Sequence, residues 1–139
     1  MARRLVFFAV VAALLFVNPA FGYFQDENAA LQSAENFLGL IDNGNYGASW
    51  EGASRIFQVR CGRQRWGEKL EGIRPFIGRV LGRAVRSVHF RDSYPEAPDG
   101  QYVIILFDSS FAHKEHAVEV VTMMLEDDGQ WRVFNYSLR

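Results

Sequence analysis

The first half of the chain has apolar residues three and four positions apart, which is the period of an amphipathic helix. Residues 30–41 follow this spacing, and the acidic and amide side chains of residues 26–28 can cap the start of such a helix. A turn cluster follows, in which Gly44 suits the left-handed position after a helix end. The same spacing predicts a second helix from about Tyr46 through Phe57 and a third over residues 65–76.

The period changes to alternation at residue 80, which indicates β-strands. Four segments have this pattern: residues 80–90, 102–111, 117–125 and 130–138. Turn-forming residues separate them, and unbroken alternation in the first segment places Arg83 and Phe90 on opposite faces. Because all helices precede all strands, the pattern predicts an α+β fold in which helices pack on a four-stranded antiparallel sheet.

The N-terminal residues have the three zones of a secretory signal peptide. Two arginines near the start precede an unbroken apolar run over residues 5–17. Small residues at Ala20 and Gly22 fit the preference of signal peptidase, which predicts a cut between Gly22 and Tyr23. The alternative is an uncleaved anchor, but this run is shorter than the ~20 residues of a membrane-spanning helix. We therefore expect a periplasmic or secreted protein that meets a membrane only through its transient signal peptide.

With residues 1–22 removed as a signal peptide, residues 23–139 have the size of one domain. The chain is 49% hydrophobic and 22% charged, which is typical of globular proteins and argues against disorder. Cys61 is the single cysteine, so the chain has no internal disulfide. We expect Cys61 to be a small buried hydrophobe rather than a reactive thiol.

Basic residues concentrate in the middle of the chain. Residues 55–91 hold ten basic and two acidic side chains, a net charge of +8, whereas residues 23–54 carry −5 and residues 92–139 carry −6. This asymmetry fits either an anionic partner or neutralisation of the middle by the acidic flanks in the fold. We favour neutralisation, and export argues against nucleic acid as a partner.

Short motifs along the expected mature chain resemble the pattern of a known family. They are residues 37–46, Ser49, Trp50, Trp66, residues 74–78, Gly82, Arg83, and residues 98–103, 119–121 and 128–136. The family comprises small exported bacterial proteins and is known as a domain of unknown function. The resemblance implies a cone of helices and curved sheet, of the nuclear-transport-factor-2-like (NTF2-like) or cystatin-like kind. It implies no catalytic residue and no ligand, because relatives with that cone include enzymes as well as binding modules.

Five residues are candidates for a ligand-binding pocket in such a cone. They are Tyr46, Trp50 and Trp66 on the predicted helices and Arg83 and Glu119 on the predicted strands. If Arg83 and Glu119 both face the helices, they form an ion pair or orient a polar ligand. The alternative is structural: the aromatic residues fill the core, and Arg83 and Glu119 form a bridge.

Signals for catalysis or metal binding are weak. An isomerase-like site needs a carboxylate base in an apolar cavity and an acid opposite it, and Asp108, Glu119 and Tyr102 are the residues available. His113 and His116 lie three apart in a predicted loop without a third ligand, so we expect no metal site. No Gly-rich phosphate loop or nucleophile motif occurs, and we expect no cofactor.

The sequence thus favours a binding or protein-interaction module over a small enzyme of the isomerase or dehydratase kind, which is the alternative. The partner is an unknown small molecule or protein, and a homodimer through the sheet is an arrangement known from such folds.

Export predicts the N-terminus of the mature protein. If signal peptidase cuts as expected, N-terminal sequencing of protein purified from its host will begin at Tyr23. A mature protein that retains Arg3 and Arg4 would contradict the predicted cleavage.

Overall fold

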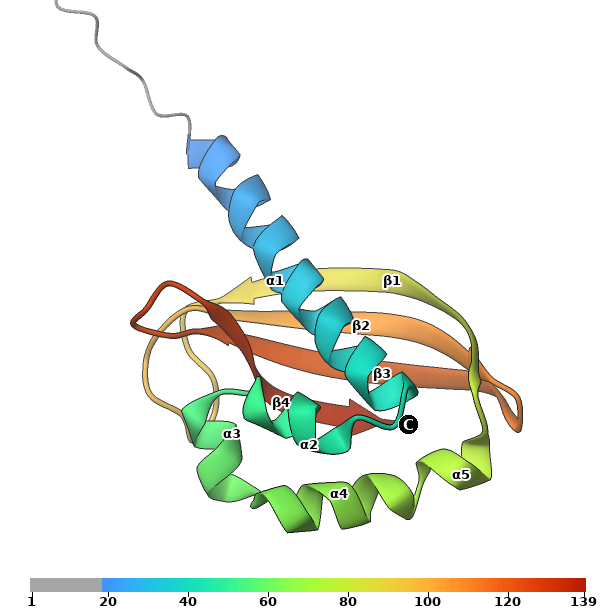
Figure 1. Ribbon diagram of the computed structural model, residues 1–139. Helices are drawn as coiled ribbons and strands as arrows, with labels where there is room; N and C mark the ends of the chain where they lie inside the picture. Colours follow the sequence, from blue (N-terminus) through green and yellow to red (C-terminus); the bar gives the residue numbers. More distant parts are fainter. Residues whose placement is uncertain (1–18) are drawn as a thin grey trace, which may run out of the picture.

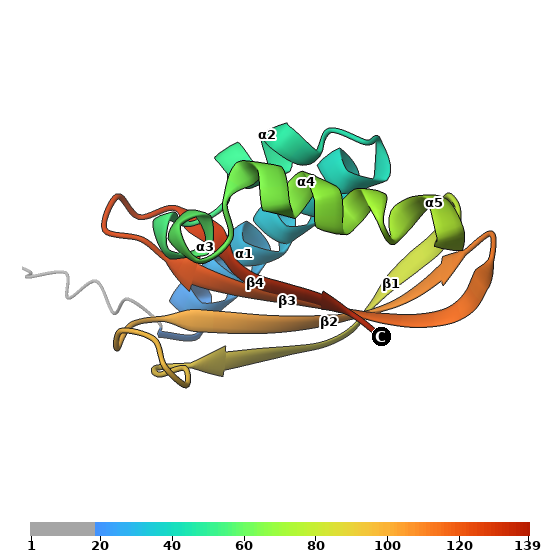
Figure 2. The same ribbon diagram turned by 90° about the horizontal axis from the view of Figure 1, so that it is seen from below.

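The computed structural model describes residues 19–139, with side chains from Asp26 onward. The predicted basic and apolar zones of the signal peptide, residues 1–18, lie outside the described residues. Five helices are followed by four strands in the described part (Figure 1). These helices lie on one face of an open antiparallel sheet (Figure 2), so the predicted α+β class is confirmed. The NTF2-like cone stays a prediction.

The first helix, α1 (Pro19–Asp42), begins earlier than the pattern predicted. The predicted start at residues 26–28 is wrong, because the helix runs through them from Pro19, whose fixed φ suits a first turn. The predicted cleavage position between Gly22 and Tyr23 lies within this helix. No helix in the described part is long and apolar enough to span a membrane.

The C-terminal half of α1 carries its core face. Its fully buried residues recur at the predicted spacing and are Ala30, Ala34, Phe37, Leu38 and Ile41. The helix ends where Gly44 takes a φ of 76°, and Asn45 N–H donates to the carbonyl of Leu40 at 2.8 Å. This end places Asp42 beside the sheet.

The other predicted helices are each divided in two. The second is α2 (Tyr46–Glu51) and α3 (Arg55–Arg60), because Ser54 caps a new helix by accepting from Phe57 N–H at 3.1 Å. The third is α4 (Arg63–Glu71) and α5 (Arg74–Ile77), which follow one another through Gly72 and Ile73. Pro75 lies in the first turn of α5, where its missing N–H costs no helix hydrogen bond.

The strands agree closely with the alternation. They are β1 (Val80–Arg91), β2 (Tyr102–Phe111), β3 (Lys114–Leu125) and β4 (Trp131–Leu138), paired antiparallel in the order β1-β2-β3-β4. The inner face, which contacts the helices, has a nearly continuous buried surface. The helix α1 packs against β2, β3 and β4, and α3 packs against β4.

The first strand does not alternate evenly. The pairing of β1 with β2 shifts register between Val85 and Ser87. One extra residue at such a bulge exchanges the two faces of a strand. Arg83 and Phe90 therefore lie opposite Ser109 and Val103, which both belong to the buried face of β2. The prediction that they lie on opposite faces of the sheet is wrong.

Aromatic rings fill the space between the helices and the inner face. Trp66 stacks on Phe37 with ring centroids 6.0 Å apart, and it meets Phe57 edge-on at 5.0 Å. Tyr136 closes the group from β4, with its ring 6.0 Å from that of Trp66. Edge-to-face and offset contacts of this kind contribute beyond the burial of apolar area.

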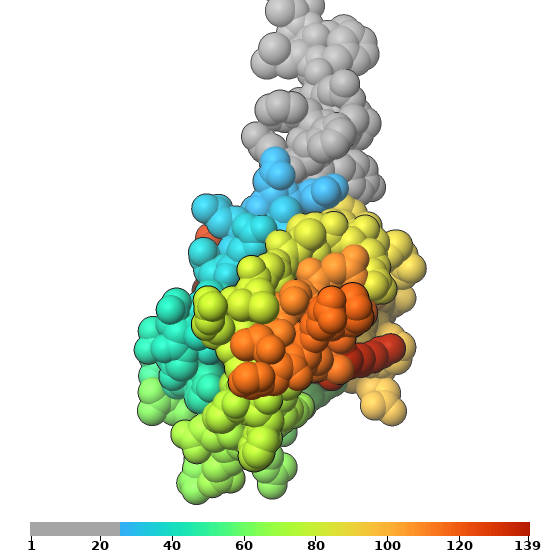
Figure 3. All heavy atoms as spheres, turned by 90° about the vertical axis from the view of Figure 1, so that its right-hand side faces the viewer, coloured from blue at the N-terminus to red at the C-terminus, as the bar shows by residue number. Residues whose placement is uncertain are grey.

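Gly78 joins the helical layer to β1 in a conformation that only glycine adopts readily. Its φ is 79° and its ψ is −170°. An added Cβ would lie 2.9 Å from Cβ of Ala112 in the β2–β3 turn. The green-yellow and orange segments are in contact at this end of the molecule (Figure 3). Two backbone hydrogen bonds fix the junction, from Ala112 to Arg79 and from His113 to Ile77.

Gly78→Ala should therefore lower the free energy of unfolding by about 1–3 kcal/mol, measured by urea denaturation. Gly82→Ala is the matched control in β1, because nothing lies within 4 Å of a Cβ there and its φ is not in the left-handed region. Equal losses of unfolding free energy from the two substitutions would contradict the requirement for glycine at residue 78.

Candidate functional site

Four charged side chains meet between the helices and the inner face, and we call them the buried charge cluster: Asp42, Arg74, Arg83 and Glu119. They come from the end of α1, the start of α5, β1 and β3. Glu119 is 0% exposed and Arg74 is 7% exposed, while the side chains of Arg83 and Asp42 are each 15% exposed. Two positive and two negative charges make the cluster neutral.

Arg83 joins both carboxylates. Its Nε donates to Glu119 at 2.6 Å, and its two terminal nitrogens donate to Asp42 at 2.7 and 3.0 Å. The fork of the guanidinium suits this double contact. Burial on its own lowers the pKa of Arg83, but the hydrogen bonds to Asp42 and Glu119 outweigh it and raise that pKa.

Arg74 closes the cluster from the other side. Its Nη1 lies 3.0 Å from Asp42 and its Nη2 lies 3.4 Å from Glu119. The guanidinium carbon lies 5.0 Å from the ring centroid of Phe111, a cation–π contact. Its Nε is buried and has no hydrogen-bond partner among the described residues.

Two hydroxyl groups complete the surroundings of Glu119. Ser109 Oγ donates to Oε2 at 2.6 Å, and the Tyr136 hydroxyl donates to Oε1 at 2.7 Å. Both carboxylate oxygens therefore accept from one hydroxyl and one arginine. Burial and the neighbouring charge of Glu119 raise the pKa of Tyr136, so its proton is held firmly. The arrangement positions side chains and presents no free base.

The structure brings together two of the five residues predicted for the pocket, Arg83 and Glu119, as an ion pair. Trp66 is 2% exposed, and its Nε1 donates to Ser49 Oγ at 2.9 Å. Trp50 and Tyr46 are partly buried against the core, and Trp50 Nε1 donates to the carbonyl of Cys61 at 2.7 Å. The three aromatic side chains thus pack among protein atoms.

Sequence reasoning missed four partners in this site: Asp42, Arg74, Ser109 and Tyr136. Ser109 and Tyr136 lie on the inner face by alternation, which is the one signal that could have identified them. Asp42 sits in a turn cluster and Arg74 precedes a proline, positions that carry no sign of burial.

The residues weighed for catalysis and metal binding lie apart. Asp108 is exposed on the outer face of the sheet, where it pairs with Arg86, whereas Glu119 lies inside. Tyr102 is buried, and its hydroxyl donates to the carbonyl of Pro98. His116 is exposed on β3, and the described residues contain no group of His, Cys, Asp or Glu suited to hold a metal ion.

The acidic flanks neutralise part of the basic middle segment. Arg63, Arg74, Arg83 and Arg86 form ion pairs with carboxylates outside residues 55–91. The other six basic residues have no ion pair within the described residues, and they are Arg55, Arg60, Arg65, Lys69, Arg79 and Arg91.

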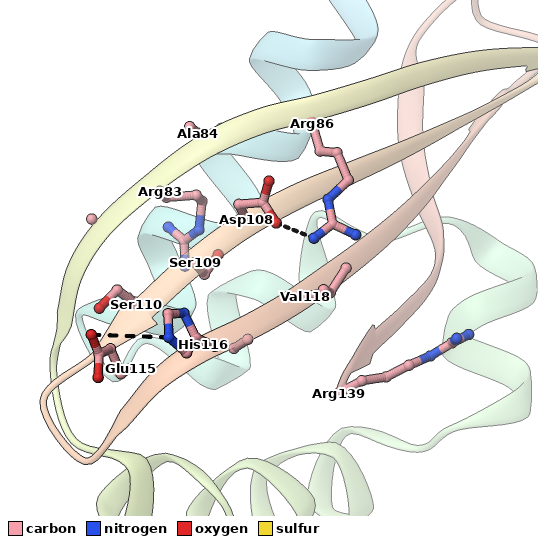
Figure 4. A pocket seen from close by; sticks show the side chains of 12 residues that line it. Arg83, Ala84, Arg86, Asp108, Ser109, Ser110, Glu115, His116, Val118 and Arg139 are labelled. Carbon is pink, nitrogen blue, oxygen red and sulfur yellow. Dashed lines mark hydrogen bonds and ion pairs between the residues drawn. The ribbon is translucent and has the colours of Figure 1, made fainter.

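A groove of about 860 Å³ lies on the outer face, opposite the helices (Figure 4). Arg86 and Asp108 point out of the sheet and pair with each other, and Arg139 lies on the far side of Val118, just after the end of β4. Glu115 lies near the hairpin end of the groove. Val118 and Ala84 add apolar surface. The groove therefore combines both signs of charge with short apolar side chains.

Comparison with known proteins identifies one family. The sequence model of a family described as "Protein of unknown function (DUF4019)" matches residues 33–136. The match includes all four residues of the buried charge cluster. No curated protein matches the chain.

A double-mutant cycle tests the buried charge cluster. Glu119→Gln should lower the free energy of unfolding by about 3–5 kcal/mol, because it leaves two buried arginines with one carboxylate. Arg83→Met should have a similar effect. The double variant should lose less than the sum, because Arg74 and Asp42 still balance each other. Arg86→Ala, in the exposed pair, is the control and should change stability little. Additive or negligible losses in urea denaturation would contradict the coupling.

The pKa of Tyr136 predicts a loss of stability in alkali. Its pKa in the folded state is raised above the ordinary 10.0, so its contribution is full below pH 10 and declines as the pH rises further. Between pH 9 and 11 the wild type should lose more unfolding free energy than Tyr136→Phe. Parallel pH profiles of the two proteins would contradict this role of Tyr136.

Proposed function

Because the chain belongs to the DUF4019 family of proteins of unknown function, we propose a function from its surfaces: an exported binding module, periplasmic or secreted, that acts through the outer face of its sheet. A second copy of this chain is the occupant we propose for that face. Export rests on the signal-like pattern of residues 1–22.

One observation carries the proposal: the described helices cover the inner face only (Figure 2). The outer face is nevertheless rich in aliphatic side chains that are half-buried within the chain itself: Ile104, Leu106, Val118, Val120 and Met124. An antiparallel sheet with one solvated face usually carries polar residues there. Aliphatic residues on both faces favour a second protein surface, and sheets pack face to face at about 10 Å.

The charged side chains of the outer face favour a second copy of this chain as the partner surface. A two-fold interface brings one patch against itself, so the patch must contain both signs of charge. The outer face does: Arg86 and Asp108 lie side by side on it, while Glu115 lies toward the hairpin end and Arg139 toward the opposite side (Figure 4). In an antiparallel arrangement the basic side chains of one copy can meet the acidic side chains of the other.

A small enzyme, the alternative, has less support. Its site needs a carboxylate and an acid that converge on a cavity. Glu119 is enclosed by two arginines and two hydroxyls, and Asp108 lies on the other face of the sheet. The Tyr102 hydroxyl donates a hydrogen bond to the backbone carbonyl of Pro98.

Analytical ultracentrifugation tests self-association. The wild type should sediment as a dimer, and Leu106→Lys should shift it to monomer without changing the circular dichroism spectrum, because a charge in the centre of the interface is not paired. Val59→Lys is the control, since Val59 is 76% exposed on α3, away from the sheet. A wild-type monomer, or a Leu106→Lys dimer, would contradict the proposed occupant.

A further inference from the structure

The first strand of the sheet, β1, has a free edge. Within the described residues it pairs with β2 alone, and it is the outermost strand in Figure 1. The described helices pack mainly on the other three strands. The backbone groups that β1 turns away from β2 are therefore placed to form hydrogen bonds with an added strand.

The hydrogen bonds of the sheet show which backbone groups of β2 face β1. Leu125 N–H donates to the carbonyl of Gln101 at 3.0 Å, so Gln101 lies in a hydrogen-bonded pair with β3. Along an antiparallel strand, residues turn their backbone groups alternately to one neighbour and to the other. The even-numbered residues of the range 102–108 therefore bond to β1.

The register of β1 and β2 then identifies the residues at the free edge. The residues that bond to β2 are Ala84, Ser87, His89 and Arg91. Arg83, Val85 and Val88 lie opposite the alternate residues of β2, so they turn their N–H and C=O groups outward. These outward groups form no hydrogen bond within the described residues.

Apolar side chains accompany this edge. Leu81 is 55% exposed and Val85 is 41% exposed, although both are aliphatic residues of a strand. A strand added beside β1 covers such side chains, and the burial of their apolar area favours its binding. In this mode of recognition, backbone hydrogen bonds supply affinity and the side chains supply specificity.

The charge of the edge favours an acidic partner. Residues 79–91 hold four arginines and no acidic residue. Arg83 and Arg86 pair with carboxylates of this chain. Arg79 and Arg91, at the two ends of the strand, are exposed and form no ion pair within the described residues. Opposite charges on neighbouring strands attract each other, so carboxylates are the groups that complement both ends.

A second copy of β1 does not suit the same edge. Pairing of two such strands brings the arginines of both copies together with no acidic residue in either strand, and like charges on neighbouring strands repel each other. The bulge between Val85 and Ser87 also increases the local twist. A flexible segment follows that twist more readily than a strand already held in a folded sheet.

We propose that the free edge of β1 binds an extended acidic segment of a partner protein, which adds to the sheet as a fifth strand. The backbone of this segment bonds to Arg83, Val85 and Val88, and its carboxylates meet Arg79 and Arg91. The contact uses the edge of the sheet rather than its outer face, so it goes beyond the proposed dimer and does not depend on it.

Fluorescence anisotropy with a labelled peptide tests this site. The probe is a twelve-residue peptide in which glutamate alternates with valine, the length of β1, and it should bind saturably. A peptide with lysine in place of glutamate should bind at least about tenfold more weakly, because its charges repel the arginines. The glutamate peptide with its six central amides N-methylated should also lose about tenfold or more, because it keeps the charges and lacks the backbone donors.

Substitutions at residue 85 test the backbone contact. The N–H of Val85 faces the free edge, so Val85→Pro removes a donor to the peptide without removing a bond to β2. It should weaken peptide binding by about tenfold or more. Val85→Thr is the matched control, since it keeps the N–H and the branched shape, and it should leave binding nearly unchanged.

Two further variants keep the test valid if Val85→Pro fails to fold. Arg91→Glu should weaken peptide binding by about fivefold or more, whereas Arg65→Glu, on α4 and equally exposed, should not. Leu106→Lys, which is designed to break the dimer of the outer face, should bind the peptide as the wild type does. This variant separates the edge from the proposed function.

Other outcomes would overturn the proposal. They are no saturable binding, equal affinity for the lysine or the N-methylated peptide, equal effects of the two substitutions at Val85, equal effects of Arg91→Glu and Arg65→Glu, or loss of binding in Leu106→Lys. A wild-type dimer that Val85→Pro converts to monomer would instead assign the edge to a second copy.

Discussion

The pairing of Glu119 with two arginines is the interaction on which the arrangement of the layers depends. A fully buried carboxylate is tolerated only when nearby charges and hydrogen bonds replace its water. Arg83 comes from β1 and Arg74 from α5, and both also hold Asp42 at the end of α1. The partners of one side chain therefore fix the end of α1, the start of α5 and the first strand relative to β3. Hydrophobic packing alone is less directional and allows these elements to slide.

Alternation identified the four strands within a few residues, because a half-buried sheet requires that period at every strand. The helices were less predictable. Their apolar spacing continues across Gly52 and Ser54, and across Gly72 and Ile73, although the chain bends there. The cap at Ser54 was visible in the sequence as a residue type, but its use depends on the tertiary fold. The bulge at Val85 left no signal, since register is decided by the partner strand.

The candidate site was predictable to the extent that it follows strand alternation. Arg83 and Glu119 lie on strands of one sheet, and the sequence predicted that they pair or orient a ligand if both face the helices. They form an ion pair in the structure, because the bulge moves only the residues beyond Val85 to the other face. Their binding of a ligand stays a prediction. Asp42 and Arg74 come from helix ends, and their burial depends on how the helices cross the sheet. A tertiary arrangement of this kind has no counterpart in local spacing.

Because side chains fill the interior, the outer surfaces of the molecule are the candidates for binding a partner. In the buried charge cluster every carboxylate oxygen is paired, and Trp66 with its aromatic neighbours occupies the space above the sheet. Arg74 Nε is buried and has no hydrogen-bond partner among the described residues, so the network is not fully satisfied on the side of α5. The other contacts of Arg74 and Arg83 still join α1, α5 and β1 to Glu119 on β3. The outer face lies on the other side of the sheet that these contacts order, so the surface proposed for self-association depends on the same buried charges for its shape.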